Sequence, residues 1–221
     1  MFSKSNYNLL GFLAYEKKTK NYMKKFQKTN NNDINQNKLI KFIEYTFNYA
    51  NICLPKYSSY FSNHIYTQPV LFTILAIKVY TRTTYRQITD LLQLSDRIKQ
   101  YLGIKNVPHF TTLQKFFQKL PSSIFKTINQ LILTLYPVKG EIIALDGTGF
   151  TNDYADKYYA IIRAKERKSY VKNHIAIDIK TRLILNYATQ RGPRSDTKFA
   201  ISSIRQTRKY NPHYILADRA Y

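Results

Sequence analysis

The chain has 221 residues, 44% of them hydrophobic, and a formal net charge of +22 from 35 lysines and arginines against 13 acidic residues. That hydrophobic content can form a core and excludes a fully disordered chain, while no apolar run reaches the roughly 18 residues needed to span a membrane. The charge favours a polyanionic partner, with nucleic acid the leading candidate. One cysteine excludes an intrachain disulfide, and no signal-peptide pattern is found, so we expect a cytoplasmic protein without a membrane partner.

The first part of the chain predicts a tail and then helices. Residues 1–37 are rich in lysine and asparagine without a sustained apolar pattern, which predicts a basic flexible arm. From Lys38 on, apolar residues at spacings of three and four predict an amphipathic helix, and a second helix begins near Pro69. The last helix of this part spans about 123–136 and ends before Pro137.

Three short helices are expected between the second and the last of these. Capping patterns at Thr84 and Thr111 predict the starts of the first and third, and Ser95 the start of the one between them. The cluster resembles a helix-turn-helix arrangement, in which one helix reads base edges in the major groove. Amphipathic helices that merely pack together give the same pattern. The exposed candidates for DNA binding in this region, residues 38–138, are Gln114, Lys115, Gln118 and Lys119.

Beyond Gly140 the pattern changes from helical to strand-like. Ile142–Leu145 is a continuous apolar run typical of a buried central strand; Asp146 follows it, and Gly147–Gly149 are expected to turn the chain. The later elements are a strand at 171–178, a hairpin loop, a strand at 183–189, a helix to about Lys209, and a strand at 214–217 that ends at Asp218. Strand, strand, strand, helix, strand is the first half of a ribonuclease-H-like mixed sheet. The predicted fold class is therefore α+β, with an all-helical N-terminal region.

Several other polar residues in this part have a functional and a structural interpretation. The stretch between residues 157 and 172 is basic, and it either contacts phosphates or forms a solvated surface. Asp178 and Asp196 fall in a hairpin loop and at a helix start, where local hydrogen bonds favour aspartate, so both are predicted to be structural. His174 lies inside an apolar strand. The candidate phosphate contacts are Arg163, Lys165, Arg167 and Lys168.

Three short motifs in the C-terminal part carry a family resemblance. Leu145-Asp-Gly-Thr-Gly-Phe150 is similar to a first-aspartate motif, Gly192-Pro-Arg-Ser-Asp196 to the turn before a helix, and Ala217-Asp-Arg-Ala-Tyr221 to a second-aspartate motif. Their order, their strand context and the 72 residues between the aspartates (218 minus 146) make the set specific. The segment from Ile143 to Tyr221 thus resembles the catalytic domain of DDE transposases of prokaryotic insertion sequences.

The resemblance implies a catalytic domain over 139–221 that cleaves DNA strands at element ends and joins them to target DNA. Two Mg²⁺ or Mn²⁺ ions are implied, with Asp146 bridging both and Asp218 binding one. The implied partners are double-stranded DNA, both terminal repeats and target, and at least a second copy of the chain; the implied location is the nucleoid when DNA is bound. The family's third acid, a glutamate on a later helix, has no counterpart, so we expect a C-terminally incomplete domain, inactive or nearly inactive alone.

Two other interpretations stay open. The chain could be a non-catalytic DNA-binding protein derived from a transposase, which occupies element ends and inhibits the complete enzyme. It could also be a different ribonuclease-H-like nuclease or resolvase.

Overall fold

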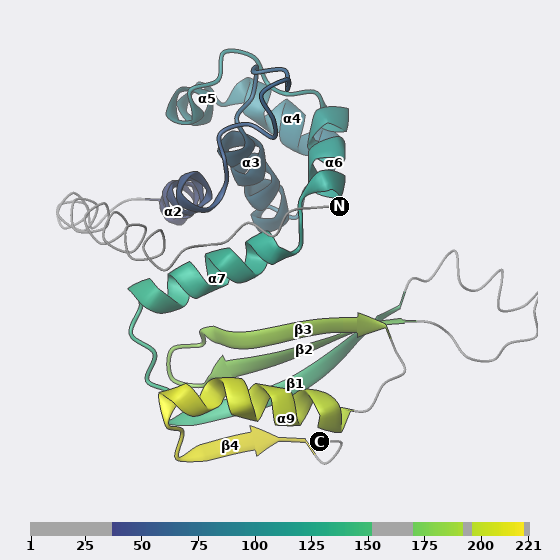
Figure 1. Cartoon of the computed structure of the whole chain (residues 1–221). Helices are drawn as coiled ribbons and strands as arrows, with labels where there is room; N and C mark the ends of the chain where they lie inside the picture. Colours follow the sequence, from purple (N-terminus) through teal and green to yellow (C-terminus); the bar gives the residue numbers. More distant parts are fainter. Residues whose placement is uncertain (1–36, 152–169, 192–195, 219–221) are drawn as a thin grey trace, which may run out of the picture. The chain divides into compact units, whose positions relative to one another are not determined.

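The computed structural model describes residues 37–151, 170–191 and 196–218, and its fold is α+β, as predicted (Figure 1). The chain divides into two compact units, Met1–Ile128 and Asn129–Tyr221. This division falls inside the helix that precedes the sheet, whereas the expected boundary at 138/139 marks where helical structure gives way to strands. The predicted arm lies outside the described residues apart from Asn37, whose side chain caps the first described helix.

The core of the first unit forms around one helix that is apolar on every side. The helices are α2 (Lys38–Cys53), α3 (Gln68–Tyr80), α4 (Tyr85–Leu94), α5 (Asp96–Leu102), α6 (Phe110–Lys119) and α7 (Ser123–Leu135). Helix α3 buries Val70, Ile74 and Ile77, and it contacts α2, α4 and α6. A helix that is apolar all round must be enclosed by its neighbours. The amphipathic helices around α3 supply that enclosure.

The start of α4 follows the sequence pattern. Thr84 Oγ1 accepts a hydrogen bond from the Gln87 backbone N–H at 3.2 Å, and Gln87 Oε1 accepts one from the Thr84 N–H at 2.8 Å. The predicted capping box is confirmed, and two of the N–H groups at this helix end are satisfied. Ser95 precedes α5 as predicted, but its side chain forms no capping hydrogen bond.

The start of α6 differs from the predicted one. The helix begins at Phe110, and His109 is its cap residue, with Nδ1 accepting a hydrogen bond from the Thr111 N–H at 3.4 Å. His109 has extended backbone angles and follows the buried Pro108, which ends the loop before the helix. Thr111 therefore lies within the first turn, and the prediction that it caps α6 is wrong.

The second unit contains a four-stranded mixed sheet with strand order β3-β2-β1-β4 (Figure 1). Its elements are β1 (Ile142–Thr151), β2 (Tyr170–Asp178), β3 (Ile184–Arg191), α9 (Asp196–Thr207), the 3-10 helix η1 (Arg208–Tyr210) and β4 (Tyr214–Ala217). Strand β2 is antiparallel to both β1 and β3, and β4 is parallel to β1. The predicted order of strands and helix is confirmed.

Strand β1 is longer than predicted. Gly147 and Gly149 do not turn the chain; they pair with His174 and Lys172 of β2, and the strand continues to Thr151. A glycine inside a strand is tolerated when a neighbouring strand provides a full hydrogen-bonding ladder, as β2 does here. Asp146 consequently lies within a strand rather than at its end.

The two faces of the sheet have different surroundings. On the α9 face, Ile143, Leu145 and Ala176 form a core with residues of α9, and Phe199 of α9 stacks on His174 with ring centroids 4.5 Å apart. On the other face, called here the carboxylate face, β1 places Ala144, Asp146 and Thr148 opposite Ile177, Ile175 and Asn173 of β2. Asp146 and Thr148 are exposed. Directly opposed residues share a face, so the register alone defines both sets.

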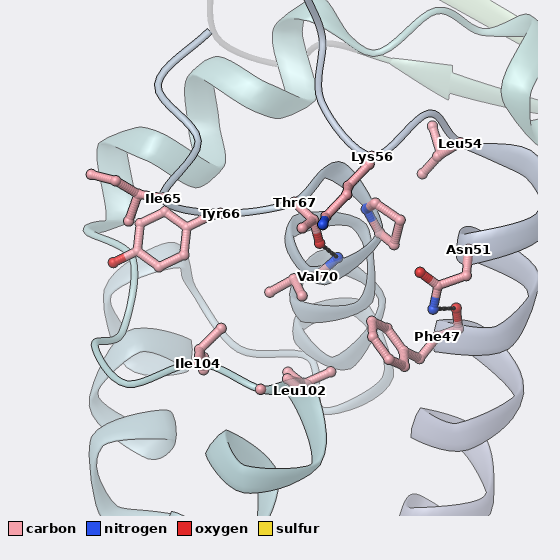
Figure 2. A pocket seen from close by; sticks show the side chains of 12 residues that line it. Phe47, Asn51, Leu54, Lys56, Ile65, Tyr66, Thr67, Val70, Leu102 and Ile104 are labelled. Carbon is pink, nitrogen blue, oxygen red and sulfur yellow. Dashed lines mark hydrogen bonds between the residues drawn. The ribbon is translucent and has the colours of Figure 1, made fainter.

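The first unit also contains a cavity of about 310 Å³ (Figure 2). Its walls are mostly apolar, and two of the polar residues that line it form hydrogen bonds with the backbone of the same unit. Asn51 Nδ2 donates to the Phe47 carbonyl at 2.9 Å, and Thr67 Oγ1 accepts from the Val70 N–H at 3.4 Å, which caps α3. These side chains therefore stabilise helix ends.

None of the described helices has both the length and the apolar character that a membrane crossing requires.

Candidate active site

Asp146 and Asp218 lie on neighbouring strands of the sheet. The parallel pairing of β1 with β4 runs as far as Leu145 opposite Ala217. Asp146 directly follows Leu145, and Asp218 directly follows Ala217. Adjacent strands are about 5 Å apart, and in a parallel register the next residues on both strands point to the same face. The two carboxylates are therefore brought side by side on the carboxylate face.

The Asp146 carboxylate is accessible to a ligand. Its residue is exposed, and Oδ1 accepts a hydrogen bond from the Gly147 N–H at 2.7 Å. In the described part of the chain Asp146 forms no ion pair, although 35 of the protein's residues are lysine or arginine. Asp218 is also exposed. The pair is thus open to solvent, as a site that must admit both a cation and a large substrate has to be.

The donor set fits a divalent cation. Mg²⁺ is a hard ion that prefers carboxylate oxygens, and it is commonly held by one or two carboxylates while it keeps several waters. Asp146 and Asp218 provide two such carboxylates. Among residues 37–151, 170–191 and 196–218, however, no group of three or more histidine, cysteine, aspartate or glutamate side chains is placed to hold a metal. The described residues therefore supply two carboxylates for a metal ion and no third ligand of these types.

Asp178 has a structural role, as predicted. Its side chain is fully buried on the α9 face, where Oδ2 accepts from the Lys139 N–H at 3.1 Å and from Thr181 Oγ1 at 2.6 Å, and Oδ1 accepts from the Lys180 N–H at 3.2 Å. Burial raises the pKa of this carboxyl, but the hydrogen bonds from Thr181, Gly140, Lys139 and Lys180 lower it by more, so the pKa lies below its ordinary value. The carboxylate joins the hairpin loop to the segment before β1.

His174 is a core residue. It is fully buried, stacks on Phe199, and its Nε2 lies 2.7 Å from the side-chain nitrogen of Gln190. An amide nitrogen can only donate, so the ring nitrogen accepts in this hydrogen bond. Because His174 lies on the α9 face and the two aspartates on the other, it is not a ligand of the candidate metal site.

The candidate DNA-binding residues fall into two groups. Those on α6 are all exposed along one helix surface, and they are Gln114, Lys115, Gln118 and Lys119. Arg86 of α4 lies over the Phe110 ring at the start of α6, with its guanidinium carbon 5.0 Å from the ring centroid, so a further cation adjoins this helix. The other group lies outside the described residues and consists of Arg163, Lys165, Arg167 and Lys168.

Two residues of the carboxylate face were not singled out from the sequence. Asn173 and Tyr187 each have a buried oxygen, Oδ1 and Oη, without a hydrogen-bond partner. Burial also raises the pKa of the Tyr187 hydroxyl, which stays neutral. Both are polar residues within apolar strands. From the sequence alone, Asn173 could be assigned to the same face as Asp146 only if the pairing register of β1 and β2 were known.

The comparisons with known proteins concern this second unit. Residues 137–221 match the family model of the transposase DDE domain. This range contains the whole sheet, both aspartates and α9, and the α+β fold agrees with the ribonuclease-H-like architecture expected of such a domain. Among curated proteins, none matches the chain. The match supports a function in DNA transposition, a process that requires binding of DNA, and enzymes with this domain use divalent metal ions.

Proposed function

We propose that the chain is a DDE transposase of an insertion sequence, whose second unit holds divalent ions for cleavage and transfer of DNA strands at the element ends. One observation supports the proposal most: within the segment that matches the transposase domain, β1 and β4 are paired in parallel up to Leu145 opposite Ala217, and Asp146 and Asp218 are the residues that directly follow this pair. A carboxylate on a strand can instead have a structural role, as Asp178 does by accepting hydrogen bonds from buried donors. Asp146 differs because it is exposed and has no buried donors to satisfy.

The two aspartates would hold Mg²⁺ or Mn²⁺. When bound, such ions activate the attacking oxygen and stabilise the leaving oxygen of an in-line displacement at phosphorus. The chain's own residues supply negative charge at one point of the sheet and leave that face open to DNA. Two carboxylates hold a second ion weakly, so we expect this chain alone to cleave DNA poorly or not at all.

DNA would be bound by both units. The net charge of +22 favours a phosphate backbone. Exposed glutamines and lysines on α6 have the chemistry that reads base edges and contacts phosphates. Residues Arg163, Lys165, Arg167 and Lys168 would add phosphate contacts. Joining of two element ends requires two active sites in one complex, so the working assembly would be at least a homodimer.

A second candidate function is DNA binding without catalysis. It is favoured by the absence of a third metal-ligating side chain beside Asp146 among the described residues. A protein that binds element ends but does not cut them would compete with a complete transposase for the same DNA.

The experiment that separates these functions measures binding and strand cleavage on the same DNA. Wild-type chain and Asp146→Ala are incubated with supercoiled plasmid and Mn²⁺, and binding to a duplex is titrated at several salt concentrations. Nicking by wild type that Asp146→Ala abolishes supports the transposase. Binding of both proteins to DNA with no nicking by either is expected of the second candidate and of a poorly active transposase alike. Mn²⁺ binding that Asp146→Ala abolishes then supports the transposase, whereas a wild-type chain that binds DNA but no Mn²⁺ supports the second candidate. Absence of DNA binding by both proteins overturns both functions.

A matched pair of variants tests the role of α6. Each lysine that contacts a phosphate contributes about one unit to the slope of log affinity against log salt. Replacing both Lys115 and Lys119 by alanine is expected to reduce that slope by about two. Lys38→Ala, at an exposed position on α2, should leave it unchanged. An unchanged slope in the double variant would remove α6 from the proposed interface.

A further inference from the structure

The carboxylate face has an unpaired acceptor close to Asp146. The Oδ1 atom of Asn173 is buried and has no hydrogen-bond partner. Buried amide oxygens in native proteins are nearly always paired with protein or with ordered water, so each exception requires an explanation. On the α9 face of the same sheet the corresponding amides are paired: Asn186 donates to Ser203 Oγ at 3.0 Å, and Gln190 donates to His174.

The strand register defines where Asn173 lies relative to the aspartates. Asp146 is opposite Ile175, and Thr148 is opposite Asn173, in the antiparallel pair of β1 with β2. Asn173 is therefore a diagonal neighbour of Asp146 on the same face, at a Cα separation of about 7–8 Å. Tyr187, whose hydroxyl is also unpaired, is opposite Ile175 on β3 and so lies one strand further from Asp146. Of these two residues, Asn173 is the nearer to Asp146.

We infer that Asn173 is a positioning residue of the cation site, and that its Oδ1 accepts a hydrogen bond from a water in the hydration shell of the cation held by Asp146 and Asp218. The inference rests on the proposed function. It adds an outer-sphere acceptor to the two carboxylates, which would orient the hydrated ion on the sheet.

Chemistry and position both support this assignment. Mg²⁺ releases its waters reluctantly and keeps several of them, and each such water donates hydrogen bonds, so the site needs acceptors around the ion. An amide oxygen without a partner is such an acceptor. An acceptor that contacts a water of the hydrated ion would not need to touch the carboxylates themselves, so a diagonal neighbour of Asp146 on the same face could take this role.

The test is the affinity of the full chain for Mn²⁺, measured from the electron paramagnetic resonance signal of the free ion. Asn173→Ala is expected to weaken binding by about tenfold, the lower limit for loss of an outer-shell partner. Asn173→Asp keeps Oδ1 in place and adds a charge, so it should bind Mn²⁺ at least as tightly as wild type. Asn186→Ala serves as the matched control because it removes the same amide from the α9 face; it should leave the affinity within about twofold of wild type. Thermal unfolding of each variant shows that it is folded.

Three results would contradict the inference. If wild type binds Mn²⁺, Asp146→Ala abolishes binding, and Asn173→Ala binds as wild type does, the role of Asn173 is wrong and the proposed function stands. If wild type binds Mn²⁺ no better than Asp146→Ala, the proposed metal site itself is wrong. Weaker binding by Asn173→Asp than by wild type would also overturn the inference, since the acceptor is present in that variant.

Discussion

The two faces of one sheet use polar side chains in different ways. On the α9 face the buried polar groups have partners: Asp178 accepts three hydrogen bonds from the residues around it, and His174 is paired with Gln190. On the carboxylate face Asp146 is exposed without an ion pair among the described residues, and Asn173 Oδ1 is buried without a partner. The difference shows that polarity in a strand does not by itself indicate a site. The buried polar residues of the α9 face are explained by folding, whereas the buried Oδ1 atom of Asn173 on the carboxylate face is not.

The largest effect is expected from an aromatic side chain of the α9 face. Phe199→Ala should lower the free energy of unfolding by about 3–5 kcal/mol, because it removes a buried ring and leaves a cavity against His174. Phe150→Ala is the control on the carboxylate face, where the ring is 55% exposed, and it should change stability by less than about 1 kcal/mol. Chemical denaturation followed by tyrosine fluorescence measures both. Equal losses would mean that the two faces are equally covered.

The next effect compares two aspartates of the sheet. Asp178→Ala should destabilise the protein by about 2–4 kcal/mol, because two backbone N–H groups and the Thr181 hydroxyl lose their acceptor in a buried place. Asp146→Ala should change stability by no more than about 0.5 kcal/mol, since its side chain is exposed. Hydrogen exchange of the β2 and β3 amides distinguishes them. A large loss on replacing Asp146 would indicate a structural role and weaken the metal proposal.

A smaller effect is the pH dependence that Asp178 causes. Its pKa is lower in the folded protein than in the unfolded chain, where an aspartate titrates at about 3.9. The carboxylate therefore contributes stability that is fully present above the unfolded pKa and is lost as pH falls through the lowered folded pKa. Asp178→Asn cannot titrate, so its free energy of unfolding should fall less than that of wild type between pH 5 and pH 3. Parallel pH profiles for the two proteins would show that this carboxyl is not responsible.

The smallest effect is expected at the exposed edge of the sheet. Leu216 on β4 is 53% exposed, and its partner Ala144 places it on the carboxylate face. Leu216→Ser should alter the free energy of unfolding by about 0.5 kcal/mol or less. Ile143→Ser, at a fully buried position of the neighbouring strand, is the contrasting variant and should lose several times as much. Similar losses in the two would show that β4 is as well enclosed as β1.

Much of the fold could be predicted from local patterns. The helical spacing after Lys38, the Thr84 capping box and the stop before Pro137 depend on neighbours within one turn, and all three agree with the structure. The start of α6 was predicted wrongly. The sequence pattern indicated Thr111 as the capping residue, whereas His109 caps the helix in the structure. The turn expected at Gly147 was wrong for a different reason: the pairing with β2, which is distant in sequence, keeps those glycines in the strand.

The candidate site was predicted in part. Asp146 and Asp218 follow apolar runs, a pattern visible in the sequence, and in the structure they come directly after the paired residues Leu145 and Ala217. Asn173 could not be selected in the same way. An asparagine between Lys172 and His174 has no distinctive spacing, and its relation to Asp146 exists only through the register of β1 and β2. The phosphate-contact candidates at Arg163 to Lys168 stay predictions.

The sequence by itself determined the element types and their order, because hydrophobic periodicity and capping are local properties of a chain; the roles of Asp146 and Asp218 stay a prediction. Only the tertiary structure decided which polar residues share a face. A shift of one residue in strand register moves every side chain to the other side of the sheet, so face membership depends on long-range pairing. That pairing places Asp146 on the carboxylate face with Asn173, and Asp178 among the hydrogen-bond donors of the α9 face.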